Sequence, residues 1–224
     1  MVHRPSSAFG LVAAMLALTP LCSGAENTKP SLPPFKFLDL RVGAGTTEAP
    51  NVTEKVVSPT ASWDVDWGDA KSAPRFSVLA LGGLSWVNTG PIVGIEASLA
   101  RHTLGSDTQG ATEIHMTQQS VLFLAGWQYG ISLNKEIQAH VEVAPMYGAV
   151  LSYFDRGEAG HVINPEYGVR TGLFLSERQV TAGVVAAWVR SSGTIDTPTA
   201  PGTTSEVSYS IRGWRISAEL GYRF

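Results

Sequence analysis

His140 and Glu142 are the two side chains whose types and spacing best suit catalysis. In a β-strand, positions two apart share one face, so the imidazole could meet the carboxylate or a serine hydroxyl on a facing strand. A histidine base oriented by an acid would suit a hydrolase. No serine nucleophile motif accompanies the pair, so we expect it to fill space in the interior rather than to catalyse.

The other histidines and acids offer weaker sites. Glu113 and His115 repeat the same spacing beside a predicted loop, and His102 and His161 stand at loop edges, where imidazoles are usually solvated. A metal site needs three or four converging ligands, and no cluster here has a recognised spacing. One run of aspartates resembles a calcium loop but lacks its twelfth-position glutamate: Asp64, Asp66 and Asp69. The sequence therefore predicts no metal, no cofactor and no catalytic residue.

The C-terminal segment shows the kind of element that must position these side chains. Its apolar residues occupy every second place, with charged or small residues between them: Trp214, Ile216, Ala218, Leu220, Tyr222 and Phe224. This alternation is the period of a β-strand with one apolar face. A bilayer-spanning strand needs roughly 9 to 11 residues, which the segment 214–224 supplies.

Six further segments repeat the alternation, which makes seven strands with the C-terminal one: 75–87, 93–99, 121–129, 137–153, 167–175 and 180–188. Pro145, within one of them, predicts a β-bulge. The connections alternate between short and long, the short ones being 88–91, 134–135 and 176–178 and the long ones 105–112, 155–161 and 191–205. Outer-membrane barrels have short periplasmic turns and long extracellular loops, so this order predicts the topology.

The first strand has two candidates, 37–45 and 60–68. Both cannot span the membrane, because single-chain bacterial barrels have an even number of strands. We prefer 37–45, whose second face is small and polar like that of the other strands, and we expect 60–68 to extend the hairpin above the membrane. The loop 191–205, rich in threonine, is then the longest predicted surface loop unless 46–74 forms a single one.

The charged residues of these strands fall on the inward face of a closed barrel. Four acids and four arginines predict ion pairs across the lumen, since an isolated buried charge is costly: Asp39, Arg41, Glu96, Glu142, Arg170, Arg215, Glu219 and Arg223. Side chains fill the lumen of an eight-stranded barrel, which leaves little room for a water channel. The alternative is a narrow, gated pore that opens when the pairs break.

The N-terminal 25 residues predict a cleaved signal peptide, with His3 and Arg4 before an apolar stretch and small residues at 23–25. Cleavage would remove the sole cysteine, Cys22, and with it thiol or disulfide chemistry. Residues 26–36, rich in proline, are predicted as a periplasmic lead, and 37–224 as the barrel. No later apolar run reaches the roughly 18 residues of a membrane helix.

Composition agrees with a membrane-embedded β-protein. Charged residues make up only 16% of the chain, apolar residues 44%, and the net charge is −3. The low charge content argues against disorder, and the negative balance gives no basic surface for nucleic acid.

With its signal peptide, eight amphipathic segments, alternating turn lengths and terminal Leu220-Gly221-Tyr222-Arg223-Phe224, the chain resembles the small outer-membrane barrels of the OmpA-transmembrane and opacity-protein type. The resemblance implies an all-β, eight-stranded antiparallel transmembrane β-barrel in the outer membrane of a Gram-negative bacterium. It also implies that Leu220, Tyr222 and Phe224 form the signal read by the barrel-assembly machinery, and that lipid and lipopolysaccharide surround the barrel.

A fold alone does not define a function. We expect a structural or adhesion-like role at the cell surface, with an unidentified extracellular ligand. The alternatives are a lipid A-modifying barrel enzyme and a narrow porin-like channel.

Overall fold

The computed structural model describes residues 35–67, 72–85, 89–105, 114–154, 161–200 and 203–224. The predicted signal peptide, 1–25, and nearly all of the lead, 26–36, lie outside these residues. The secondary-structure elements of the described chain are all β-strands, and none of the described residues forms a helix long and apolar enough to cross a membrane. The strands are β1 (Phe35–Thr47), β2 (Asn51–Val57), β3 (Ser62–Asp66), β4 (Ala73–Ser85), β5 (Thr89–Leu104), β6 (Ile114–Ser132), β7 (Ile137–Phe154), β8 (His161–Glu177), β9 (Val180–Ala200) and β10 (Thr203–Arg223).

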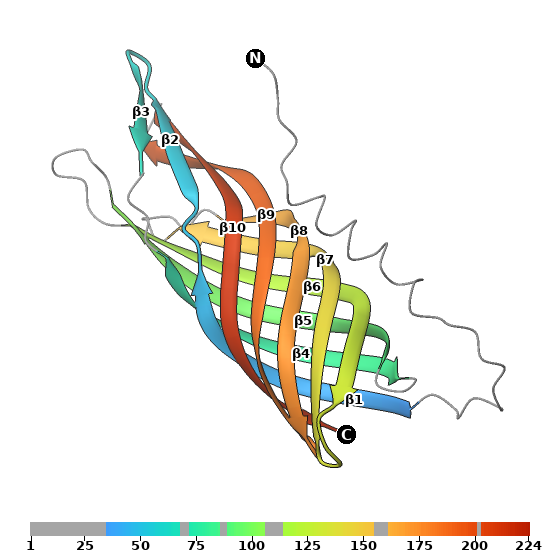
Figure 1. Ribbon diagram of the computed structural model, residues 1–224. Helices are drawn as coiled ribbons and strands as arrows, with labels where there is room; N and C mark the ends of the chain where they lie inside the picture. Colours follow the sequence, from blue (N-terminus) through green and yellow to red (C-terminus); the bar gives the residue numbers. More distant parts are fainter. Residues whose placement is uncertain (1–34, 68–71, 86–88, 106–113, 155–160, 201–202) are drawn as a thin grey trace, which may run out of the picture. The chain divides into compact units, whose positions relative to one another are not determined.

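Eight of these strands form a closed antiparallel ring, β1 and β4 to β10 (Figure 1). Each ring strand pairs with the next ring strand along the chain, β1 with β4 at the start. β1 also pairs with β10 to close the ring, with Asp39 opposite Arg223 and Thr47 opposite Arg215. The predicted eight-stranded barrel is confirmed, and so is the choice of 37–45 as the core of its first strand. Closure leaves no free edge in the membrane, where an unpaired backbone group would be costly.

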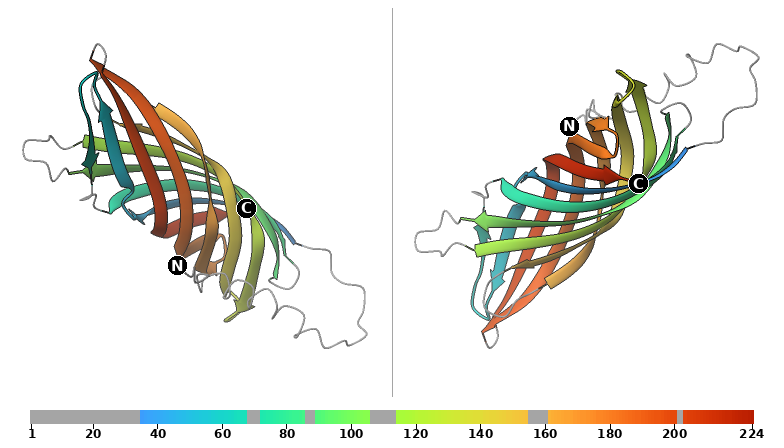
Figure 2. Two further views of the ribbon diagram at one scale, coloured as in Figure 1. Left: turned by 90° about the horizontal axis from the view of Figure 1, so that it is seen from above. Right: turned by 90° about the horizontal axis from the view of Figure 1, so that it is seen from below.

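The β2–β3 hairpin continues the β1–β4 hairpin beyond the ring. Both β1 and β2 pair with β10, and the register between Thr47 opposite Arg215 and Asn51 opposite Ser210 shifts by a single residue. β3 then returns along β2, with Lys55 opposite Asp64. As expected, the segment 60–68 extends the hairpin instead of spanning the membrane. The C-terminus lies beside β1 at the opposite end of the barrel (Figures 1 and 2).

The predicted long loop 191–205 is wrong, because most of it is strand. β9 reaches Ala200 and β10 begins at Thr203, with Ser192 opposite Ser210 and Ile195 opposite Val207. Ile195 of β9 and Val207 of β10 are buried, so the alternation of inward and outward residues continues beyond the predicted membrane-spanning segments of both strands. The β-branched threonines that suggested a loop also favour strands. Most of the other two predicted loops, 105–112 and 155–161, lies outside the described residues.

The predicted bulge at Pro145 is also wrong. β7 pairs with β6 in one register on both sides of the proline, with Leu124 opposite Met146 and Trp127 opposite Val143. The exposed ring of Pro145 keeps its place on the outward face. The missing proline N–H removes a donor from the ladder but adds no residue, so the alternation keeps its phase.

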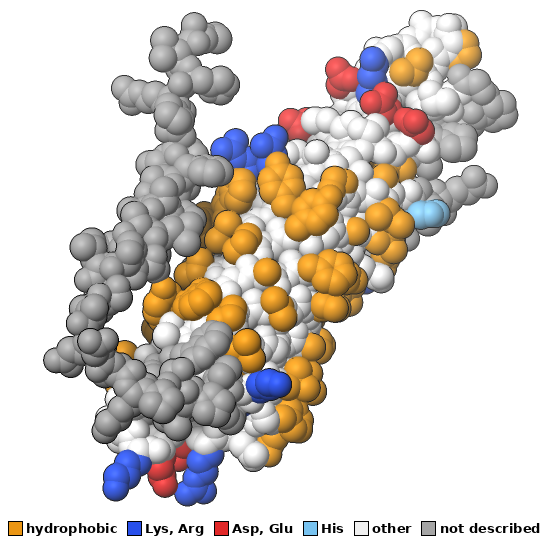
Figure 3. Space-filling model, turned by 90° about the vertical axis from the view of Figure 1, so that its right-hand side faces the viewer, with side chains coloured by type: hydrophobic (Ala, Val, Ile, Leu, Met, Phe, Trp, Pro, Cys, Tyr) orange, Lys and Arg blue, Asp and Glu red, His pale blue; other side chains and the backbone are white. Residues whose placement is uncertain are grey.

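On the face that Figure 3 shows, apolar side chains cover the middle of the barrel and most exposed charged side chains lie toward its two ends. Large hydrophobic residues point outward on all eight ring strands, among them Val42, Phe76, Ile95, Phe123, Val141, Leu173, Val184 and Ile216. A closed strand ring with such a belt of outward hydrophobic residues is the arrangement of an outer-membrane barrel. Inward positions carry the alternate residues, which include the candidate lumen charges.

Candidate functional site

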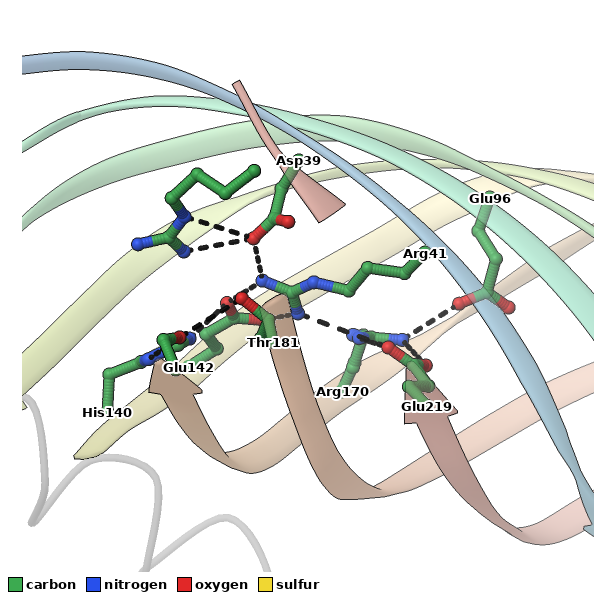
Figure 4. Close-up of polar contacts among 10 residues, drawn as sticks. Asp39, Arg41, Glu96, His140, Glu142, Arg170, Thr181 and Glu219 are labelled. Carbon is green, nitrogen blue, oxygen red and sulfur yellow. Dashed lines mark hydrogen bonds and ion pairs between the residues drawn. The ribbon is translucent and has the colours of Figure 1, made fainter. Parts of the chain in front are cut away.

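Arg41 of β1 is at the centre of a buried ionic cluster in the lumen (Figure 4). Its Nη1 and Nη2 donate to Glu142 Oε2 and Oε1 on β7, at 2.8 and 2.6 Å. Nη2 also donates to Asp39 Oδ2 at 2.8 Å. The three side chains are buried. A bidentate pair backed by a second carboxylate is the geometry that best offsets the desolvation of a buried guanidinium.

Arg170 of β8 forms a second centre of the same cluster. It donates from Nη1 and Nη2 to both oxygens of Glu219 on β10, each at 2.7 Å, and from Nη1 to Glu96 Oε2 on β5 at 3.1 Å. Arg41 Nη1 lies 4.0 Å from Glu219 Oε2, which connects the two centres. The charges therefore link strands on several sides of the ring.

The structure places all eight predicted lumen residues in ion pairs. Arg223 donates to Asp39 Oδ2 at 2.9 Å, and its guanidinium lies 4.3 Å from the centre of the Phe37 ring. Arg215 donates to the two oxygens of Glu166 at 2.5 and 2.8 Å.

Two further members of the network escaped sequence reasoning. Arg75 pairs with Glu96, and Glu166 pairs with Arg215. Arg75 could be predicted from the alternation in 75–87, because apolar Phe76 and Val78 suit the outward face, which turns Arg75 inward. Glu166 lies one residue before the predicted start of its strand, since β8 begins at His161.

Ser176 of β8 lies beside His140 and Glu142, a neighbour that the sequence did not reveal. Its Oγ lies 3.5 Å from His140 Nδ1 and 3.0 Å from Thr181 Oγ1. The other ring nitrogen, Nε2, lies 3.3 Å from Glu142 Oε1 but makes no hydrogen bond. Residues of a serine–histidine–acid triad thus meet inside the barrel, without the alignment that base catalysis requires.

The surroundings of His140 are those of a packed residue. Its ring stacks on the Phe174 ring, with the centroids 5.2 Å apart. The Arg41 guanidinium lies 4.1 Å from the centroid of the Phe174 ring. Ser176, His140 and Glu142 are all nearly inaccessible to solvent. Glu142 is also engaged with Arg41. His140 and Glu142 therefore fill the lumen and hold Arg41 in place. A hydrolase needs an opening through which its substrate reaches the catalytic residues.

The remaining histidine and aspartate candidates do not come together into a site. His102 Nε2 lies 3.2 Å from Gln118 Oε1 inside the barrel, and His115 Nδ1 lies 3.3 Å from Thr103 Oγ1. His161 is exposed, as are Asp64 and Asp66 on β3. Glu113 and Asp69 lie outside the described residues. Within the described part of the chain, no three histidine, cysteine or acidic side chains gather to hold a metal.

Apolar side chains pack inside the barrel beyond the charges, at the end that carries the β2–β3 hairpin. Leu104 of β5, Met116 of β6 and Ile195 of β9 are buried there. Phe154 of β7 lies 6.3 Å from the Tyr209 ring of β10, centroid to centroid. Contacts between strands so far apart in the ring mean that side chains cross the interior at this level.

The predicted assembly signal lies on the outer surface of the closing strand. Leu220, Tyr222 and Phe224 are exposed, and the rings of Tyr222 and Phe224 meet edge to face, 4.9 Å apart. The Phe224 N–H donates to Leu38 O at 2.8 Å, so the final residue pairs with β1.

No protein-family model matches the chain, and no curated protein is significantly similar to it in sequence. Among solved structures, the outer membrane protein OprG from Pseudomonas aeruginosa is 10% identical, over 87% of this chain and 98% of that one, with a TM-score of 0.53. Ail of Yersinia pestis, the attachment invasion locus protein, is 12% identical over 84% and 99%, with a TM-score of 0.39. The protease OmpT from Escherichia coli is 14% identical over 88% and 99%, with a TM-score of 0.42. The chain has the fold of a small outer-membrane β-barrel.

Proposed function

We propose that this protein is a structural barrel of the outer membrane that presents a surface for contact with an extracellular ligand. The observation that carries this proposal is the lumen, which is crossed by the Arg41 and Arg170 clusters and packed with apolar side chains beyond them. A buried ionic network with matched partners rigidifies a barrel more readily than it transports or transforms a substrate.

The surface available for contact is the extended hairpin end. β9 and β10 each span 21 residues, well beyond the roughly 9 to 11 needed to cross a bilayer. The excess of β9 pairs with that of β10, β10 pairs in turn with β2, and β3 adds an outer strand. Exposed residues there include Trp63, Asp64 and Lys55, a mixture of aromatic and charged groups suited to protein contact. Lipopolysaccharide would surround the barrel just below this surface.

Conductance tests the structural part of this proposal. We expect the purified barrel in a planar lipid bilayer to show no stable conducting state, because Arg41 and Phe174 cross the lumen together. The double variant Arg41→Ser, Phe174→Ala removes these groups and should increase ion flux. Stable conductance of the unaltered protein would instead support the narrow channel.

Adhesion tests the surface part. Cells that carry the full protein should bind cultured epithelial cells better than cells whose protein has residues 52–65 replaced by a tight turn. The shortened barrel keeps the whole ring, so its amount in the outer membrane should be equal. Equal adhesion at equal amounts contradicts a contact role for the β2–β3 hairpin.

The approach of Ser176 to His140 gives a second candidate, a lipid A hydrolase. We expect lipid A mass spectra to be the same in cells with the protein, without it, and with His140→Gln or Ser176→Ala. A lipid A species that depends on the protein and disappears in both variants, at normal barrel levels, would establish the enzyme.

A further inference from the structure

A hollow lies on the outer wall of the barrel, at the end that carries the tight turns and the C-terminus. It is an open depression with a volume of about 580 Å³. Its apolar lining comes from the starts of β7 and β9 and the ends of β8 and β10: Ile137, Leu175, Val180, Ala182 and Tyr222. Ala182 stands opposite Leu175 on one side and Leu220 on the other. The small alanine therefore forms a floor between larger walls.

The hollow belongs to the lipid-facing belt. Leu175 is 54% exposed, Val180 49% and Tyr222 42%, and each occupies an outward position of its strand. Outward apolar side chains of a membrane barrel face the acyl chains, so hydrocarbon is the expected neighbour of this depression. Tight turns face the periplasm in outer-membrane barrels, so the hollow opens to the leaflet that contains phospholipid.

Charged groups stand at the rim of the hollow, in the turn between β8 and β9. Glu177 and Arg178 both line it and are exposed to solvent. Arg178 has a positive φ of 54°, which sharpens the turn, and its Nη2 lies 3.4 Å from Glu136 Oε1 of the neighbouring turn. The Tyr222 hydroxyl donates to Gln179 Oε1 and ties the wall to the same turn. The rim thus offers a cation and carboxylates side by side.

We propose that this hollow binds one phospholipid whose zwitterionic headgroup carries a primary amine, such as phosphatidylethanolamine. One acyl chain lies over Ala182 between Leu175 and Tyr222. The phosphate accepts hydrogen bonds from the Arg178 guanidinium, and the ammonium group donates to the Glu177 carboxylate.

The charges at the rim select this headgroup over the two common alternatives. Phosphatidylglycerol offers a phosphate to Arg178 but places no cation beside Glu177 and Glu136. Phosphatidylcholine carries a positive charge, but its quaternary nitrogen has no N–H to donate to a carboxylate. Of these three headgroups, only phosphatidylethanolamine combines a phosphate that accepts hydrogen bonds from Arg178 with an ammonium group that donates to the acids.

Native mass spectrometry of the full protein in detergent micelles tests the site. With added phosphatidylethanolamine, we expect one retained lipid per barrel. Ala182→Leu fills the floor with an apolar side chain and should lower retention roughly tenfold, whereas Ala80→Leu, an outward alanine on β4, should leave it unchanged. Equal retention by Ala182→Leu and the unaltered protein overturns the site.

The headgroup is tested separately with lipids of identical acyl chains. The unaltered protein should retain phosphatidylethanolamine over phosphatidylglycerol and phosphatidylcholine by roughly tenfold. Glu177→Gln should abolish the preference over phosphatidylcholine, and Arg178→Gln should reduce retention of all three. Equal retention of the three lipids by the unaltered protein overturns the assignment of the amine headgroup.

Discussion

Arg41 connects more of the ring than any other residue of the ionic network. It contacts acids on its own strand and on β7, approaches Glu219 on β10, and lies over the Phe174 ring of β8. The hydrogen bonds of its Nη1 and Nη2 therefore replace part of the water that the guanidinium loses on burial. Loss of a single partner should destabilise the network. The remaining buried charge keeps the cost of desolvation but loses the ion pair that offsets it.

Glu142→Gln should accordingly destabilise the barrel. The change removes the charge of a carboxylate that accepts two bonds from Arg41, and we expect a loss of about 3 kcal/mol in the free energy of unfolding. Urea unfolding in phospholipid vesicles, followed by tryptophan fluorescence, measures it. Glu136→Gln is the matched control, because its exposed pair with Arg178 contributes less than about 1 kcal/mol. Similar midpoints for the two variants would show that the buried pair contributes no more than a surface pair.

Phe174 depends on a glycine beside it. A Cβ on Gly172 would overlap the Phe174 ring, and that ring cannot move aside because His140 and Arg41 stack on it. Gly172→Ala should therefore cost about 1 to 3 kcal/mol by overpacking. A Cβ on Gly82 would meet only the carbonyl oxygen of Phe37, at 3.8 Å, so Gly82→Ala should unfold at nearly the same urea concentration as the unaltered protein. Equal effects of the two alanines would mean that the ring is free to shift.

At the scale of elements, the outward face of β10 determines how the strand sits in the bilayer. Ala218 is exposed on the outward face of β10, midway between the outward aromatic residues Trp214 and Tyr222. Ala218→Arg should lower stability by roughly 2 to 4 kcal/mol, the cost of a cation near the bilayer midplane. Thr204→Arg places the same cation on the same strand beyond the belt and should have little effect. Refolding yields and urea midpoints in vesicles compare them, and equal tolerance would refute the assigned membrane depth.

Alternation predicted the ring strands because each strand carries its own apolar face, which is a local property of the sequence. It also placed Asp39 and Arg41 inward without any knowledge of the fold. The partner of each charge could not be predicted in this way. Arg41 and Glu142 are 101 positions apart, and only closure of the ring brings them together.

Composition alone gave a wrong prediction for 191–205, because it does not show how β9 and β10 pair. The Ser, Thr and Gly content of 191–205 is typical of loops, yet Ile195 and Val207 stand opposite each other across the hairpin. Ser176 was missed for a similar reason, since nothing in its neighbours along the chain indicates that it faces His140. Both errors concern contacts between strands, which the period of one strand does not encode.

At the scale of the whole molecule, we propose that the barrel-assembly machinery recognises the outward residues Leu220, Tyr222 and Phe224. Phe224→Asp should reduce the protein recovered in the outer membrane, while synthesis continues at the same rate. Phe224→Tyr keeps the aromatic ring and should assemble normally. Membrane fractionation after pulse labelling measures both variants, and full assembly of the aspartate variant would contradict recognition through this residue.

The pairing of β10 with β1 also sets the order of events during folding. β10, which follows the other ring strands along the chain, must find the first strand of the barrel, as the pairing of Asp39 with Arg223 requires. Such long-range contacts raise the contact order and slow folding, because loop-closure entropy is lost before the contacts form. A chain that stops short of β10 leaves β1 and β9 as open edges, which invite aggregation. Ring closure by β10 therefore separates chains that contain all eight ring strands, which have no open edge, from truncated chains, which keep two.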